Sequence, residues 1–342
     1  MDMLFNDKID LHIHTNFSNG KDDLISVLKQ AERNNVKVIS ITDYNSLLSY
    51  IKLKNSIDIT NYFTGKIIVG LEVRTRFLVN GQSRNCDMLV YNIDLDKVEE
   101  FQKWLEQNTG KDQLYEEQLI QLNHFKIIAK KLGLKYDEDL TIEDLNSKAG
   151  YVMINNLLKY YDENIKIWPN LKRYKDNSTT AWIEVFINPS SEFFFDISKY
   201  TPRLEDFLQV AHEYGGLVFA AHPFAYISNC ESEEKAISEL LNYVNTCLAY
   251  GVDGVECFNQ YNCNIVPYAL FASRELLKYC IENNIKISGG TDYHSNNDTR
   301  SSGIGILGKE NVYNIKTFIP YGIISNWAKP LIIENNGITR KR

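Results

Sequence analysis

Short apolar runs alternate with helical patterns along this chain, and this alternation limits its fold more than any other feature. Runs of this kind are typical of buried strands, and the segments between them repeat apolar residues at helical spacing. Strands that alternate with helices favour an α/β domain with a largely parallel sheet. We expect strands at residues 9–14, 36–42, 66–73, 88–93, 217–221, 252–258 and 285–288, and helices at 24–34, 204–214, 232–250 and 267–284.

Strand patterns stop between residues 95 and 199. In their place, apolar residues recur at helical spacing, as at Val98 and Phe101. We therefore predict a helical insertion at 95–199 inside one α/β domain, made of residues 1–94 and 200–342, whose two parts could close a single barrel. The insertion is rich in aromatic residues, which could stack on a base, although the packing of a small helical bundle accounts for them more simply.

The composition predicts a soluble globular protein. The 342 residues are 44% hydrophobic and 24% charged, which provides a buried core and argues against disorder. The formal net charge of −7 gives no global attraction to nucleic acid or anionic membranes. We find neither a signal-peptide pattern nor an apolar stretch suited to a membrane span, and we expect a cytoplasmic protein. The six cysteines form no Cys-x-x-Cys pair and are expected to be reduced.

Two histidines, His12 and His14, end the first expected strand. Side chains at this spacing point to the same face of a strand, so both imidazoles could bind one metal ion. An isolated His-x-His pair is as often two unrelated histidines. Here, however, His222 and His294 also lie at or just beyond the ends of expected strands, which is the edge where ligands collect in barrels and open α/β sheets.

Acidic residues occupy the same edge. Asp43, Glu72 and Glu256 follow apolar runs, Asp87 precedes one, and Asp292 shares a glycine-rich turn with a histidine. A single acidic residue is usually paired or caps a helix, but so many beside four histidines indicate bound metal, because a buried carboxylate needs a cation. Mixed histidine and carboxylate ligands are typical of a multinuclear hydrolytic centre, whose metals lower the pKa of a bound water.

Taken in order, these motifs resemble those of the PHP family, named for polymerase and histidinol phosphatase domains. The resemblance rests on Asp10-x-His12-x-His14-Thr15, Ile41-Thr42-Asp43, Gly70-x-Glu72, Ala221-His222-Pro223, Gly254-Val255-Glu256 and Gly290-Thr291-Asp292-x-His294. It implies a distorted, TIM-like (β/α)7 barrel that binds up to three divalent metals and hydrolyses phosphate esters. The insertion resembles the lid of the stand-alone phosphoesterase branch, some members of which act on nucleotides or oligonucleotide ends.

The resemblance also implies how the ligands are divided between the metal ions. The first ion would be held by His12, His14, Glu72 and Asp292. Glu72 would bridge to a second ion, which His222 would also bind. Asp87 stands where the family usually has a histidine and could serve as a further ligand of the second ion.

The family's third metal site is incomplete in this sequence. Asn19 and Tyr44 stand where the family usually has an aspartate and a histidine, which leaves only His294 and Asp43. We therefore expect two divalent ions, with zinc, manganese or iron as the first candidates and magnesium as a further one. A third ion would bind weakly or not at all.

Cationic side chains beside the metals would bind a phosphate group. Arg74 lies two residues after Glu72, and Arg300 follows the last histidine motif. A guanidinium matches phosphate in bidentate fashion, although solvated surface arginines are an equal alternative for both. Tyr44 could donate its hydroxyl group to a phosphate oxygen or could simply fill space.

The sequence thus predicts a metal-dependent phosphoesterase. A metal-activated water would attack phosphorus, and Asp292 or His294 would assist proton transfer. The substrate would be a phosphate mono- or diester on a phosphorylated small molecule, a nucleotide or a nucleic-acid end. The alternatives are a catalytically weakened metal-binding or regulatory module, and a hydrolase of other substrates on the same fold.

Overall fold

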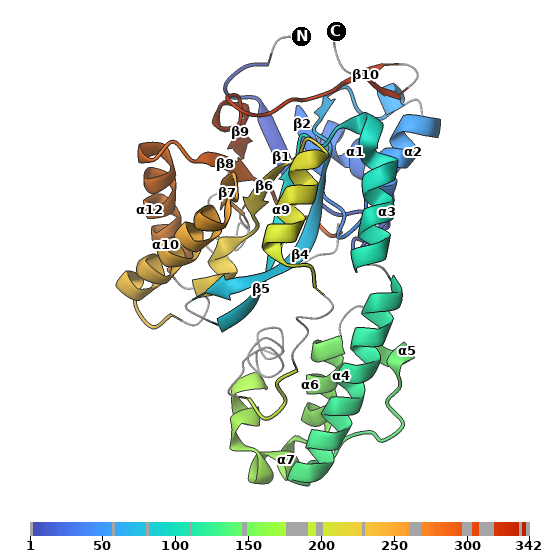
Figure 1. The fold of residues 1–342 in the computed structure, drawn as a ribbon, viewed down its shortest axis with the longest axis vertical. Helices are drawn as coiled ribbons and strands as arrows, with labels where there is room; N and C mark the ends of the chain where they lie inside the picture. Colours follow the sequence, from blue (N-terminus) through green and yellow to red (C-terminus); the bar gives the residue numbers. More distant parts are fainter. Residues whose placement is uncertain are drawn as a thin grey trace. The chain divides into compact units, whose positions relative to one another are not determined.

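A computed structural model of the chain shows two compact units (Figure 1). Unit 1 comprises Met1–Gln107 and Pro202–Arg342, and unit 2 comprises Asn108–Thr201. The structure describes residues 3–56, 59–79, 82–109, 111–145, 149–175, 191–195, 201–227, 230–259, 268–295, 303–307, 318–334 and 337–339.

The described strands of unit 1 form a four-stranded sheet, a five-stranded sheet and a small two-stranded sheet. The four-stranded sheet has the order β3 (Lys66–Ile67), β2 (Val38–Ile41), β1 (Lys8–Ile13), β9 (Ile319–Pro320). The five-stranded sheet has the order β4 (Gly70–Val79), β5 (Gln82–Tyr91), β6 (Leu217–Ala220), β7 (Gly254–Phe258), β8 (Lys286–Gly289). The two-stranded sheet pairs β10 (Ile332–Glu334) with β11 (Gly337–Thr339).

The predicted mixed α/β class is confirmed, but the predicted barrel is not: no sheet among the described strands closes into one. The expected strand at 66–73 is divided into β3 and β4, and β4 pairs antiparallel with β5. Since β4 ends at Val79 and β5 begins at Gln82, no crossover helix separates them, as a parallel pair would require. The second sheet is therefore mixed, with β5 also antiparallel to β6, whereas β6, β7 and β8 are parallel.

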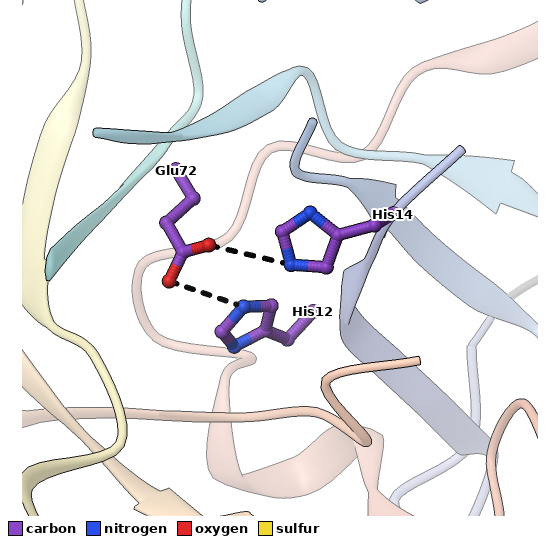
Figure 2. A group of neighbouring side chains, drawn as sticks. All are labelled: His12, His14 and Glu72. Carbon is purple, nitrogen blue, oxygen red and sulfur yellow. Dashed lines mark ion pairs between the residues drawn. The ribbon is translucent and has the colours of Figure 1, made fainter. Parts of the chain in front are cut away.

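The two larger sheets meet where β1 ends. Isolated bridges join Ile13 to Tyr293, which follows β8, and Tyr44, which follows β2, to Glu72 of β4. This arrangement brings Glu72 beside the two imidazoles at the end of β1 (Figure 2). The meeting edge of the two sheets is therefore where the predicted metal ligands gather.

Six of the described α-helices lie wholly or mostly in unit 1, and capping residues explain where two of them begin and where one of them ends. In α1, the Asp23 side chain accepts from the Ser26 backbone N–H, and in α10 the Ser232 hydroxyl accepts from the Lys235 N–H. Helix α10 ends at Gly251, whose φ of 102° suits glycine. The six are α1 (Leu24–Arg33), α2 (Leu48–Ser56), α3 (Val98–Thr109), α9 (Leu204–Glu213), α10 (Glu233–Tyr250) and α12 (Ala269–Glu282).

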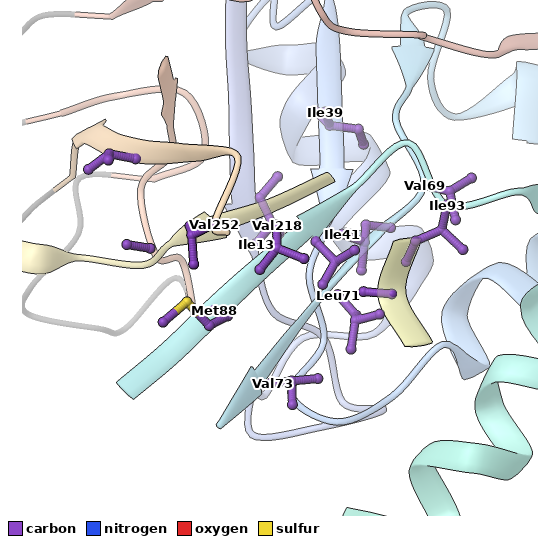
Figure 3. Packing of buried hydrophobic residues seen from close by; sticks show 14 of the residues in the cluster. Ile13, Ile39, Ile41, Val69, Leu71, Val73, Met88, Ile93, Val218 and Val252 are labelled. Carbon is purple, nitrogen blue, oxygen red and sulfur yellow. The ribbon is translucent and has the colours of Figure 1, made fainter. Parts of the chain in front are cut away.

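Buried apolar side chains from both larger sheets share one core. Ile13 and Ile41 come from the first sheet and pack in the same cluster as Leu71, Met88 and Val218 from the second (Figure 3). Full burial of such a side chain contributes about 1.5–3 kcal/mol. The shared core therefore holds the two sheets together and fixes the strand ends that carry the candidate site.

Unit 2 is helical and has its own core. Its α-helices among the described residues are α4 (Lys111–Leu132), α5 (Ile142–Leu145), α6 (Ala149–Lys159) and α7 (Tyr161–Ile167). Aromatic residues such as Phe125, Trp168 and Phe193 are buried together in this core. In the part of the chain that the structure describes, the 3-10 helices are η1 (Ile59–Asn61), η2 (Leu95–Lys97), η3 (Pro169–Tyr174), η6 (Pro223–Ile227) and η7 (Tyr321–Ile323). Across the described ranges, no helix has the length and apolar character needed to cross a membrane.

Candidate metal centre

The carboxylate of Glu72 faces two neighbouring imidazoles, those of His12 and His14 (Figure 2). Its Oε1 is 3.5 Å from His12 Nε2, and its Oε2 is 3.3 Å from His14 Nε2. His12 belongs to β1 and His14 follows it directly, so the two-residue repeat of a strand directs both rings to the same face. All three side chains are buried, and each carboxylate oxygen faces one ring nitrogen. His12, His14 and Glu72 form the first group of potential metal ligands.

Asp292 faces the same two imidazoles from the loop after β8. Its Oδ1 is 3.4 Å from His12 Nε2 and 3.2 Å from His14 Nε2. Within the described part of the chain, His12 Nε2 and both ring nitrogens of His14 are buried without a hydrogen-bond partner. A buried polar atom without a partner costs about 1–3 kcal/mol. Unpartnered ring nitrogens beside carboxylate oxygens fit a divalent cation, which would satisfy both.

A second group of ligand atoms shares Glu72 with the first. Oε1 of Glu72 is 3.1 Å from His222 Nε2, and His222 Nε2 is 3.8 Å from Asp87 Oδ2. The potential ligand atoms of Glu72, Asp87 and His222 all lie within 4.8 Å of one another. A single carboxylate thus faces two adjacent positions for a cation.

His294 belongs to a third group, with His14 and Asp292. The rings of His14 and His294 are stacked, with centroids 4.3 Å apart. His294 Nδ1 donates to the backbone carbonyl of Asp292 at 2.9 Å and lies 3.5 Å from its carboxylate Oδ1. Both predicted proton-transfer residues therefore lie at the same edge as the first group.

Asp43 is placed differently from the other predicted ligands. Its carboxylate accepts a hydrogen bond from the Thr15 backbone N–H at 2.7 Å and others from the hydroxyl groups of Thr15, Ser18 and Ser49. Both oxygens are engaged by the loop after β1 and by α2, and Asp43 belongs to none of the three groups found among the described residues. Asp43 therefore holds the loop after β1 in place through these hydrogen bonds.

Two of the three predicted substrate-binding residues lie together beside the second group. The guanidinium carbon of Arg74 is 5.5 Å from the centroid of the Tyr44 ring. Arg74 Nε donates to Asp87 Oδ1 at 3.1 Å. Arg300 lies outside the described residues. Arg74 thus contacts a predicted metal ligand directly.

Two of the candidate ligands have an unusual backbone conformation. His222 has a φ of 27° and Asp292 a φ of 52°, in the left-handed region that residues other than glycine rarely adopt. Buried carboxylates hold both segments: Glu256 accepts from the His222 backbone N–H at 2.7 Å, and Asp10 accepts from the Thr291 backbone N–H at 2.9 Å. Such strain persists where the surroundings fix it, and it is common at functional sites.

Glu256 has a larger part in the centre than the sequence indicates. The sequence places it at the strand edge without a ligand role, but its buried carboxylate accepts from His12 Nδ1 at 3.0 Å, the His222 N–H and Asn259 Nδ2. Because Nδ1 of His12 donates, the neutral ring carries its lone pair on Nε2, which faces Glu72. Glu256 therefore orients ligands of both groups.

Asp10→Ala is expected to lower the free energy of unfolding by about 3 kcal/mol or more. The buried Asp10 carboxylate accepts from the N–H and hydroxyl of Thr291, the N–H of Gly305 and the N–H of His12, and each buried donor left unpaired costs about 1–3 kcal/mol. Denaturant unfolding measures the effect. Asp206→Ala is the control, since its side chain is 66% exposed; equal effects of the two variants would contradict the assignment.

Burial and the neighbouring carboxylates have opposite effects on the pKa of the histidines in this centre. Burial by itself would lower the pKa of His12, but the carboxylates of Glu256, Glu72 and Asp292 raise it well above its ordinary value. Burial also lowers the pKa of His222, but the hydrogen bond to Glu72 outweighs this effect, and the pKa of His222 rises to about 9. In the metal-free chain a metal ion must therefore compete with a proton that each of these imidazoles holds more firmly than an ordinary histidine does.

The metal-free chain is expected to lose stability as the pH rises from about 6.5 to about 9. Protonated His12 and His222 stabilise the fold fully below their ordinary pKa of 6.5, and the contribution of His222 is lost as the pH passes its folded-state pKa of about 9. Metal binding instead becomes stronger as the pH rises, because only a deprotonated imidazole nitrogen can bind a metal ion. Unfolding midpoints of metal-free and manganese-loaded protein over this range check the prediction, and a metal-free midpoint that rises with pH would contradict it.

Several solved structures resemble this fold, and two of them illustrate the similarity to this chain. A protein from Bifidobacterium adolescentis, provisionally described as a metal-dependent phosphoesterase, has a TM-score of 0.51 and 14% sequence identity, over 87% of this chain and 92% of that chain. An amidohydrolase from Chromobacterium violaceum, with bound sulfate and no metal, has a TM-score of 0.56 and 13% identity, over 94% of each chain. At these identities the likeness is one of fold. No curated protein matches the sequence significantly.

The family assignment comes from the sequence itself. Residues 10–177, about half of the chain, match the PHP domain. The matching stretch begins at Asp10 and contains His12, His14, Glu72 and Asp87, which supply ligand atoms to the first and second groups. The chain therefore belongs to the PHP domain family.

Proposed function

We propose that this protein is a metal-dependent phosphoesterase that hydrolyses a phosphate mono- or diester. The observation that carries the proposal is the sharing of Glu72 between two adjacent groups of ligand atoms. One carboxylate between two sets of ligands is typical of two-metal hydrolases, in which the cations clamp both the attacking and the leaving oxygen. Membership of the PHP family and the description of the Bifidobacterium adolescentis protein support the same reaction class.

The proposed ligands are those of the first two groups, with Asp292 added to the first because its carboxylate faces the same two imidazoles. The first ion would be held by His12, His14, Glu72 and Asp292, and the second by Glu72, Asp87 and His222. Divalent cations bound there would acidify water and offset the charge of the phosphate. The mixed nitrogen and oxygen donors suit zinc, manganese or iron, and magnesium less well. Because Asp43 is engaged elsewhere and the third group shares His14 and Asp292 with the first ion, we propose that no third ion binds tightly.

Asp292 and His294 are the proposed proton-transfer residues. With His294 Nδ1 donating to the Asp292 carbonyl, the neutral imidazole carries its lone pair on Nε2, the atom that can accept a proton. The Asp292 carboxylate lies 3.5 Å from the His294 ring, so it stabilises the imidazolium after proton transfer. This pairing gives His294 a defined tautomer and Asp292 a role beyond ligation.

Arg74 and Tyr44 are the proposed substrate-binding residues. They lie against each other beside Asp87, and a guanidinium binds phosphate oxygens through parallel hydrogen bonds. The sulfate in the Chromobacterium violaceum structure supports the binding of a tetrahedral anion by this fold. The proposed substrates are phosphorylated metabolites, nucleotides and nucleic-acid ends.

Hydrolysis of aryl phosphates tests the proposed function. Protein loaded with manganese or zinc is expected to hydrolyse an aryl phosphate or its bis-ester, and a panel of phosphorylated metabolites, nucleotides and oligonucleotides then identifies the substrate class. Metal uptake without turnover of any ester would favour a regulatory module. Turnover of amides but not of esters would favour an amidohydrolase, as the Chromobacterium violaceum neighbour is described.

A further inference from the structure

Asp87 is shared between a cationic side chain and the second group of ligand atoms. Its Oδ1 accepts the hydrogen bond from Arg74 Nε at 3.1 Å, and its Oδ2 lies 3.8 Å from His222 Nε2. Arg74 and Asp87 are directly opposite each other in the β4–β5 hairpin, which places both side chains on one face of the sheet. The guanidinium also lies over the Tyr44 ring. Arg74 is thus held on one candidate ligand of the second cation.

The first and second groups differ in burial and in charge. The side chains of His12 and His14 are completely buried, whereas those of His222 and Asp87 are 17% and 20% exposed. Arg74 adds a positive charge beside the second group. A cation at the second group would therefore meet more solvent and a neighbouring positive charge, and both weaken its binding.

We infer that Arg74 competes with the second cation for Asp87, so that the two metal sites differ in affinity. This inference rests on the two-cation centre proposed above. A carboxylate that is bound to a guanidinium offers less negative charge to a metal ion, and the guanidinium itself repels the ion. The first cation therefore binds tightly, and the second binds weakly while Arg74 holds Asp87.

A tetrahedral anion relieves this competition. The Arg74 side chain is 33% exposed and can be reached by a ligand, and a guanidinium binds phosphate or sulfate oxygens in bidentate fashion. When the anion binds Arg74, Asp87 becomes available to the second cation. Because coupling between two ligands is reciprocal, the anion and the second cation raise each other's affinity. Arg74 thereby makes completion of the two-cation centre depend on the anionic group of the substrate.

Calorimetric titration of the metal-free protein with Mn²⁺ tests the inference, with sulfate as the anion. Without sulfate, the wild type is expected to show one tight and one weak binding event, and Asp87→Asn removes the weak one. Arg74→Gln is expected to raise the affinity for the second Mn²⁺ by roughly tenfold, equivalent to about 1.4 kcal/mol. Sulfate is expected to raise the affinity of the wild type for the second Mn²⁺ and to have a much smaller effect on that affinity in Arg74→Gln.

Two further variants serve as controls. Arg76→Gln removes the same charge two residues along β4 and is expected to leave both events and the sulfate effect unchanged. Arg74→Lys keeps the charge but not the bidentate geometry, so its second event stays weak and its response to sulfate is reduced. It also provides a second test if Arg74→Gln folds poorly.

The possible failures are distinguishable. If folded Arg74→Gln binds the second Mn²⁺ as weakly as the wild type or more weakly, the inference is wrong, although a two-cation centre and the proposed function remain. If Arg74→Lys responds to sulfate as fully as the wild type, the proposed release of Asp87 is wrong. If the wild type binds no Mn²⁺ at all, the inference and the proposed function fail together.

Discussion

His12→Ala is expected to lower kcat/KM for phosphate ester hydrolysis by roughly 10³-fold or more, equivalent to about 4 kcal/mol of transition-state stabilisation. His12 lies between 3.0 and 3.5 Å from carboxylate oxygens of Glu256, Glu72 and Asp292. Its removal takes a nitrogen ligand from the first proposed ion and leaves Glu256 without the imidazole that it orients. The variant is expected to lose the first metal as well as activity, because both depend on the same ring.

Kinetics and metal analysis of the purified variant measure this effect. His212→Ala is the matched control in the same unit: the His212 side chain is 43% exposed and pairs with Asp253 at 2.8 Å. The control is expected to keep its activity and its metal. A folded His12→Ala protein with normal metal content and near-normal kcat/KM would show that the first group is not the metal site.

Removal of divalent metal by a chelator is expected to abolish hydrolysis and to lower the unfolding midpoint. A ligand present at 1,000 times its Kd stabilises a protein by about 4 kcal/mol, and each kcal/mol shifts the midpoint of a domain this large by about 2–4 °C, so a drop of about 10 °C is expected. The loss arises because the stabilisation that a bound cation gives to the buried His12 and His14 ring nitrogens and their neighbouring carboxylates is removed. Addition of manganese to the chelated protein is expected to restore both properties.

Two outcomes of this experiment would contradict the predicted role of the metal. Chelated protein without measurable metal that still hydrolyses the ester at the original rate would exclude a metal-dependent reaction. An unfolding midpoint that does not change on removal or addition of metal would show that the unpartnered nitrogens of the first group do not bind a cation. Thermal unfolding and the rate should be measured on the same sample, so that loss of structure is not mistaken for loss of chemistry.

Strand-end positions made much of the candidate centre predictable from sequence. The two-residue spacing of His12 and His14 places both rings on one face of a strand, and His222 follows an apolar run that does become a strand. Apolar runs and helical spacing likewise predicted β1, α1 and α9 with boundaries within a few residues. The local sequence pattern was sufficient to predict the position of a side chain where a single strand or helix determines that position.

Long-range pairing was not predictable in the same way. Nothing in the apolar run at 66–73 distinguishes a parallel barrel strand from a hairpin strand, yet β4 pairs antiparallel with β5 along its full length. This hairpin places Arg74 opposite Asp87, a contact that sequence spacing does not reveal. The role of Glu256 and the engagement of Asp43 by a neighbouring loop also depend on tertiary contacts. The lid role of residues 95–199 stays a prediction.

The number of metal ions needed for hydrolysis tests the central claim most directly. Metal-free protein is titrated with Mn²⁺, and the rate of aryl phosphate hydrolysis is measured together with the number of ions bound per chain. The two-cation account predicts that the rate stays at background with one ion, rises as the second ion binds and reaches its maximum at two. A rate that does not depend on the metal, or that requires a third tightly bound ion, would contradict it.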